Sequence, residues 1–184
     1  MKQGGKGGAV ASKSGSDFEE KTYKVLVSDL NKIGFEVESI DVEKGVTRRL
    51  ILIDKNSKQI EIYFKSAIHK YFFEPRKIKT YEYFSARLEP DTAIYSDSIK
   101  TLTIIEKKQQ KGPGSVSEKL QTCDYKMLYY KTLCSPIGVE VDLIWQLGEH
   151  FNLKQESLRS VFEYLVSKGS TYYFDKVPVN KLRI

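Results

Sequence analysis

The stretch EPDTAIYSDSIKTLTIIEKK, residues 89–108, decides the expected fold of this chain and its candidate chemistry. Residues 92–95 and 100–105 are rich in β-branched and apolar side chains, and the Ser-Asp-Ser sequence between them is typical of a turn. We therefore predict two neighbouring strands, the second apolar enough to be central in a sheet. Antiparallel pairing through this turn would bring Asp91, at the start of the first strand, beside Glu106, at the end of the second.

Strand periodicity separates the two lysines that follow Glu106. Side chains alternate between the faces of a strand, so Glu106 and Lys108 project from one face and Lys107 from the other. Phosphodiester hydrolysis develops negative charge that hard cations held by carboxylates neutralise, and an adjacent lysine can orient a water. Oxygen ligands indicate Mg²⁺ or Mn²⁺ and argue against zinc. The competing interpretation is a solvated hairpin end, where acids and lysines are abundant.

A helix is predicted from about Asp17 to Lys32, ended by Gly34. Its apolar stripe consists of Tyr23, Leu26, Leu30 and Ile33. Extending this stripe backwards by four positions places Glu19 on the inward face, whereas Glu20 lies on the face of Lys24. Glu19 is therefore the helix acid that we expect to face the site.

The other expected elements alternate between strands and helices. Strands are predicted over residues 34–42, 47–53, 59–65 and 172–174, with the second and third forming a hairpin, and residues 139–147 form a further apolar stretch. Helices are predicted over about 116–131, after a Ser-Val-Ser-Glu capping box, and over about 155–168. Together these elements indicate an α/β fold with a central mixed β-sheet flanked by helices.

The stretch between the predicted hairpin and Asp91, residues 67–88, has no assignable secondary structure. It interleaves aromatic residues with lysine and arginine, which suits a nucleic-acid surface or a solvated loop pinned by its aromatics.

Composition limits the domain organisation and the partners. The 184 residues suit one domain, predicted over 17–184, after a Gly-, Lys- and Ser-rich stretch, 1–16, that is predicted to be a flexible basic tail. A net charge of +6 and a pI near 9.1 favour a polyanionic partner. No segment resembles a signal peptide or a membrane span, so we expect a soluble, cytoplasmic protein without a membrane partner.

Several other chemistries find no support in the sequence. Cys123 and Cys134 are in no CxxC arrangement and are expected to be core residues, not a disulfide or a zinc site. His69 and His150 have no ligand-spaced partners, which makes histidine or zinc chemistry a poor interpretation. Gly112-Pro113-Gly114 lacks the lysine and spacing of a nucleotide-binding loop.

Three blocks of the chain resemble the PD-(D/E)xK nucleases, and more narrowly the small type II restriction endonucleases. They are SGSDFEEKTYKVL at 14–26, RLEPDTAIY at 87–95 and IIEKKQQKGPGSVSEKLQTCDYK at 104–126. With the spacing between them, the similarity extends over about residues 14–147. It implies a restriction-endonuclease-like core within the single domain, in which Asp91 and Glu106 ligate Mg²⁺, Lys108 positions the water and Glu19 supplies a further acid for the metal.

Six further residues are candidates for contact with DNA. They are Arg87, Gln109, Gln110, Ser115, Ser117 and Lys119. The two glutamines continue the strand beyond the lysine, and an ordinary polar strand end is the alternative. Ser115, Ser117 and Lys119 stand where a helix N-terminus presents N–H groups to a phosphate, although capping alone explains Ser115. Arg87 suits guanine or phosphate, or a surface ion pair.

Three hypotheses of function remain. The first, which the resemblance favours, is a Mg²⁺-dependent type II restriction endonuclease that cuts double-stranded DNA at a short site, acts as a homodimer, accepts Mn²⁺, and belongs with a cognate DNA methyltransferase in a prokaryote or phage. The second is a repair, recombination or structure-selective nuclease with the same site. The third is a basic DNA-binding module whose acids are structural.

Overall fold

A seven-stranded mixed sheet forms the centre of the protein. The computed structural model describes residues 21–109, 116–148, 151 and 156–184, and all structural statements below concern these residues. The strands lie in sequence order across the sheet: β1 (Phe35–Glu43), β2 (Val46–Asp54), β3 (Gln59–Tyr63), β4 (Thr92–Ser96), β5 (Thr101–Lys108), β6 (Glu140–Leu147) and β7 (Thr171–Phe174). Neighbours from β1 to β5 are antiparallel, whereas β5, β6 and β7 are parallel.

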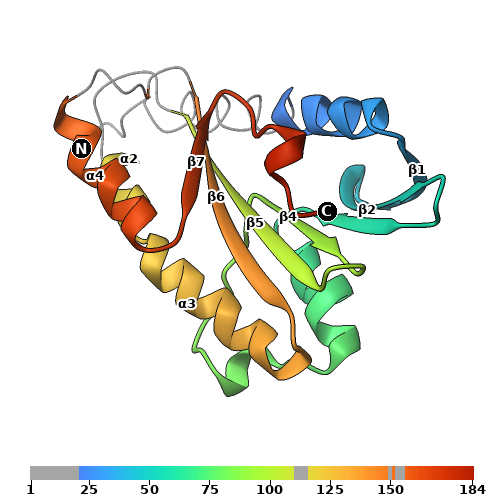
Figure 1. Cartoon of the computed structure of the whole chain (residues 1–184). Coiled ribbons are helices and arrows are strands. Elements are labelled where there is room, and N and C mark those ends of the chain that lie inside the picture. The colour runs from blue at the N-terminus through green and yellow to red at the C-terminus, as the bar shows by residue number, and fades with distance from the viewer. Residues whose placement is uncertain (1–20, 110–115, 149–150, 152–155) are drawn as a thin grey trace, which may run out of the picture.

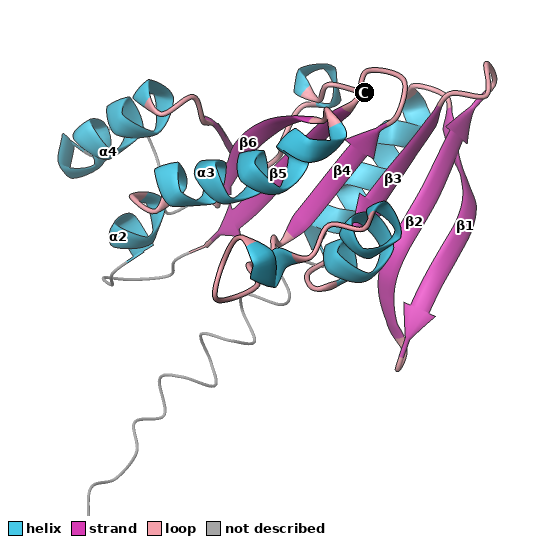
Figure 2. Ribbon diagram, turned by 90° about the horizontal axis from the view of Figure 1, so that it is seen from below, coloured by secondary structure: helices cyan, strands magenta, loops and turns pink. Residues whose placement is uncertain are grey.

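Helices cover both faces of the sheet, as the two ribbon views show (Figures 1 and 2). On one face, α3 (Cys123–Cys134) crosses from β5 to β6, which is the crossover that a parallel strand pair requires. Two further helices, α2 (Val116–Leu120) and α4 (Glu156–Ser167), lie beside it. On the opposite face, a helix over residues 21–32 packs with the chain end around Val177 and Leu182. The sheet is therefore the middle layer between two apolar cores.

The predicted α/β class and most predicted elements agree with the structure. The hairpin of β2 and β3 is present, and β5 is an internal strand whose residues from Thr101 to Lys107 are all buried. Cys123 and Cys134 are buried and free, which confirms that they are core residues. No family-specific core follows from these facts, because many α/β domains share this layering.

One predicted core residue and one predicted helix differ from the structure. Ile33, placed in the apolar stripe of the first helix, is 54% exposed because this helix ends at residue 32 and the chain turns at Gly34, where φ is +95°. The single helix predicted over 116–131 is two helices. The break occurs where the Thr122 hydroxyl donates to the carbonyl oxygen of Lys119 at 2.8 Å, and the backbone N–H of Thr122 takes the same acceptor. Local side-chain bonding thus replaces the helical pattern.

The stretch that had no prediction, 67–88, contains a π-helical turn (His69–Phe73) and two 3₁₀ helices (Glu74–Arg76 and Thr80–Glu82). Phe72 and Phe73 are fully buried in the core on the α3 face, whereas Tyr81 and Tyr83 are exposed. Part of the aromatic content of this stretch is therefore core and not surface.

Within the described part of the chain, no helix has the length and apolarity that a membrane crossing needs. The predicted tail, 1–16, lies outside the described residues, as do Glu19, Gln110, Ser115 and His150, and the side chain of Ser117 is not described.

Candidate functional site

The pairing of β4 with β5 brings the two candidate carboxylates together. Thr92 is paired with Ile105, and continuing this antiparallel register by one position sets Asp91 opposite Glu106. Asp91 shares its side of β4 with the core residues Ala93 and Tyr95, and Glu106 shares its side of β5 with Ile104. Both carboxylates therefore project toward the α3 face, and the antiparallel pairing that brings them together is the one predicted.

Asp91 is held by positive charge and by the backbone. Its Oδ1 is ion-paired with the ammonium of Lys65, which follows β3. Its Oδ2 accepts a hydrogen bond from the backbone N–H of Lys107 at 2.6 Å and lies 3.4 Å from the ammonium of Lys108. The carboxylate is thus fixed in orientation against the end of β5.

Glu106 is the most deeply buried acid of the site, with 3% of its side chain exposed. Its Oε2 lies 3.2 Å from Lys108 Nζ, and its Oε1 lies 2.6 Å from Nζ of Lys126 on α3. Trp145, its neighbour on β6, carries both ammonium groups near its ring, at 5.7 Å for Lys108 and 6.0 Å for Lys126. Cation–π attraction therefore helps to hold the two lysines beside the carboxylates.

The electrostatics keep Asp91 and Lys108 charged. Burial raises the pKa of Asp91, but the charges of Lys108 and Lys65 and the hydrogen bonds from Lys65 and the Lys107 N–H lower it more, so the net pKa is below its ordinary value. Burial lowers the pKa of Lys108, but the carboxylates of Asp91 and Glu106 raise it more. Lys108 is therefore an ammonium that can orient a water or phosphoryl oxygen, and is not a neutral base in this arrangement.

The chain that leads into Asp91 is anchored through Leu88. Its backbone N–H donates to the hydroxyl of Tyr129 at 3.0 Å, and its carbonyl lies 2.8 Å from Nε2 of His69. Because a carbonyl oxygen only accepts, Nε2 carries the proton and Nδ1 is left to accept from Thr80 at 3.3 Å. His69 thus helps to hold the backbone that leads into Asp91.

Three residues of this site carried no sequence signal: Lys65, Lys126 and Trp145. The side chain of Lys126 is mostly buried against Glu106. Lys65 adopts a left-handed backbone conformation, φ 53°, and its N–H donates to the carbonyl of Pro90 at 3.1 Å. Non-glycine residues in this region often mark functional sites, and this feature is visible only in three dimensions.

Three of the residues predicted to contact DNA lie in the described part of the chain: Arg87, Gln109 and Lys119. Arg87 forms an ion pair with Glu74 at 3.3 Å and lies 5.4 Å from the ring of Tyr81, which is the surface ion pair considered as the alternative. Gln109 continues β5 and is half-buried. Its side chain packs on Gly148, so closely that a β-carbon added to this glycine would lie 3.1 Å from Gln109 Cγ. Lys119 is exposed on α2.

The donor set suits a hard divalent cation. Asp91 and Glu106 supply carboxylate oxygens, and the three ammonium groups that converge on them show that positive charge is favoured there. Among the described residues, no group of three or more His, Cys, Asp or Glu side chains is arranged to hold a metal ion. A metal here would therefore need ligands beyond these two carboxylates, and would replace ammonium contacts that they now make.

Comparison of the chain with protein-family models, with curated proteins and with solved structures found no match. The chemistry of the site must therefore be inferred from its own side chains.

Proposed function

We propose that this protein is a Mg²⁺-dependent endonuclease that hydrolyses phosphodiester bonds of double-stranded DNA. The observation that carries the proposal is the convergence of Asp91, Glu106 and Lys108 on one face at adjacent strand ends, with Lys108 Nζ 3.4 and 3.2 Å from the two carboxylates. The net charge of +6 supports a polyanionic substrate. Within this class we propose a type II restriction enzyme, site-specific and homodimeric, of prokaryotic or phage origin.

In this proposal each side chain has a separate role. Asp91 and Glu106 would hold Mg²⁺, which would neutralise the charge on the phosphoryl and leaving oxygens; Mn²⁺ has the same ligand preference and should substitute. Lys108 donates hydrogen bonds that orient the attacking water against the phosphorus. Lys126 and Trp145 position Lys108 and Glu106, and Glu19 is the candidate for a further carboxylate.

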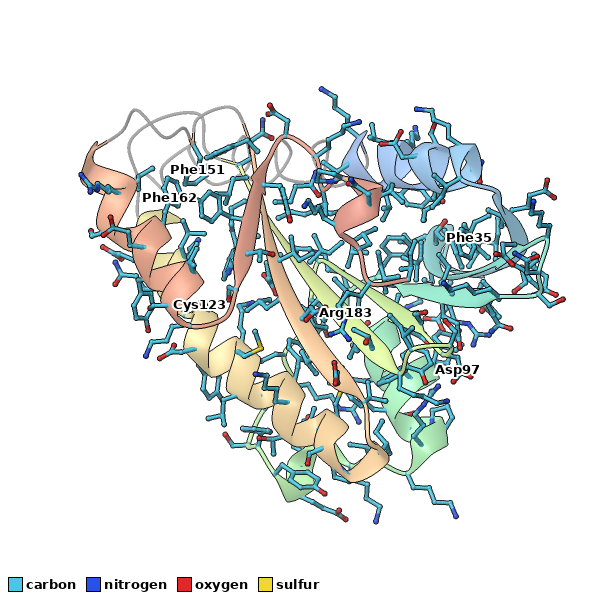
Figure 3. The ribbon with its side chains drawn as sticks, viewed as in Figure 1. Phe35, Asp97, Cys123, Phe151, Phe162 and Arg183 are labelled. Carbon is cyan, nitrogen blue, oxygen red and sulfur yellow. The ribbon has the colours of Figure 1, made fainter. Side chains whose placement is uncertain are left out.

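The test is digestion of supercoiled plasmid and of DNA of known sequence with Mg²⁺ or with EDTA. Asp91→Asn and Lys108→Met should reduce cleavage by at least a hundredfold, because each removes a group that acts on the reacting atoms. The matched control is Asp97→Asn, which removes an acid from the other end of the same strand. Asp97 is labelled in Figure 3, at the end of the sheet opposite to Phe151. Equal cleavage by Asp91→Asn and the control protein would refute the proposal.

Fixed fragments identify the restriction type, and sequencing their ends gives the cut position. Cleavage without fixed fragments would favour a repair, recombination or structure-selective nuclease with the same site. A neighbouring DNA methyltransferase gene is expected for restriction and not for these alternatives.

A non-catalytic role has one observation in its favour. Asp91 and Glu106 are both ion-paired with lysines, so the cluster can also be a buried structural network. In that case the protein binds DNA, and its affinity weakens steeply with salt, without cleavage at any metal concentration.

A further inference from the structure

A basic cleft adjoins Asp91 on the side of the sheet that faces the helix over residues 21–32. It has a volume of about 530 Å³, and its walls include Tyr23, Lys24, Arg48, Phe64, Lys65 and Lys107. Residues 45–47, in the turn from β1 and the start of β2, complete the rim. Asp91 also lines this cleft, so it is common to the cleft and to the carboxylate cluster on the α3 face.

Charge and aromatic surface are both present in this basic cleft. Its lining contains four basic side chains and one carboxylate. Tyr23 and Phe64 form an edge-to-face pair with ring centroids 5.1 Å apart, and both rings are partly buried. Cationic side chains bind phosphate and aromatic rings bind bases, and this combination is typical of sites for single-stranded nucleic acid.

The size of the cleft limits its occupant. A volume of about 530 Å³ suits a small organic molecule of nucleotide size, whereas a double helix, whose major groove alone is about 12 Å wide, cannot enter. Lys107 points into this cleft because it alternates with Glu106 and Lys108 along β5. A nucleic-acid strand that passes the site therefore meets cations on both sides of Asp91.

We propose that the basic cleft binds one nucleotide of a substrate strand, adjacent to the phosphodiester at Asp91, with its phosphate against Arg48 and Lys24 and its base against Tyr23 and Phe64. This assignment of the cleft rests on the proposed nuclease function. It adds to that function that one nucleotide of the substrate leaves the base stack beside the reacting bond. Nucleotides next to the site that are already unpaired, at mismatches or strand ends, enter at a lower unstacking cost.

Binding in EDTA tests this inference without cleavage. The probe is a fluorescein-labelled oligonucleotide of six thymidines, followed by fluorescence anisotropy from 25 to 200 mM salt, beside an abasic oligonucleotide of the same length. Arg48→Gln should weaken binding several-fold and reduce the slope of log K against log salt by about 0.7, the value for one lost phosphate contact on a single strand. Lys24→Gln should act in the same direction.

Lys55→Gln is the matched control. It removes the same charge from the same hairpin, but Lys55 lies seven positions beyond Arg48, roughly 20 Å along the strand. Tyr23→Leu tests the aromatic contact and should weaken binding of the thymidine oligonucleotide more than binding of the abasic one. Thermal unfolding of every variant checks that the fold is intact.

The outcomes separate this inference from the proposed function. If Arg48→Gln binds as tightly as Lys55→Gln, or if Tyr23→Leu affects both oligonucleotides equally, the basic cleft is not a nucleotide site. If the variants behave as expected but no metal supports cleavage, the cleft assignment holds and the nuclease proposal fails.

Discussion

The ion pairs of Glu106 should contribute measurably to stability in the absence of divalent metal. Glu106 is 3% exposed, and its partners Lys108 and Lys126 are 21% and 19% exposed. Removing one partner of a buried ion pair costs about 3–5 kcal/mol, whereas exposed pairs contribute about 0–1 kcal/mol. Because the lysines keep some contact with water, we expect Glu106→Gln to lower the free energy of unfolding by about 2–3 kcal/mol.

A double-mutant cycle in EDTA isolates the pairing from other effects of the substitution. Urea unfolding of Glu106→Gln, Lys126→Met and the double variant should give a coupling energy of about 1–2 kcal/mol. For a chain of this size, the melting temperature of Glu106→Gln should fall by about 4–12 °C. Lys126→Met keeps an unbranched apolar stem, so the loss is mainly that of the charge.

A second ion pair in the same protein provides the control. Asp97 and Lys100 are also 2.6 Å apart, but their side chains are 64% and 58% exposed. The cycle of Asp97→Asn with Lys100→Met should therefore give less than about 0.5 kcal/mol. A coupling energy for Glu106 and Lys126 that is no larger than this control value would refute the reasoning, because burial would then have no effect on the pairing.

Two further predictions concern groups outside the site. Burial lowers the pKa of His69 below its usual 6.5, although its hydrogen bond to Leu88 opposes this shift. As the pH falls below about 6.5, the unfolded chain takes up a proton that the folded protein does not, so stability should decrease until the folded pKa is reached. Urea unfolding at pH 7.5 and 5.5 should show this loss, and His69→Gln should reduce it; an NMR titration placing His69 at or above 6.5 would contradict the prediction. Burial raises the pKa of Cys134 to about 12, so this thiol should not react with a disulfide reagent at pH 8 in the native protein but should react in guanidinium; rapid native labelling of Cys134 would contradict it.

Much of the candidate site followed from local periodicity. Alternation along β5 separates Lys108 from Lys107, and the turn after β4 fixes the antiparallel pairing that sets Asp91 opposite Glu106. Both inferences use residues within one hairpin, where sequence distance and spatial distance correspond. The helix break at Thr122 was missed because the apolar positions continue at helical spacing across it, while a single side-chain hydrogen bond interrupts the backbone.

The sequence by itself determined the α/β class, the strand hairpin, the common face of Glu106 and Lys108, and the position of Asp91 beside Glu106, because these depend on side-chain alternation and on short connections. Only the tertiary structure decided that Lys65 and Lys126 complete the charge cluster. Lys65 lies 26 positions before Asp91, and α3 brings Lys126 to Glu106 only when its crossover packs on the sheet. The basic cleft, too, forms only when the first helix and the β1–β2 hairpin meet beside Asp91. Such contacts depend on packing between distant segments, and no local pattern in the chain encodes them.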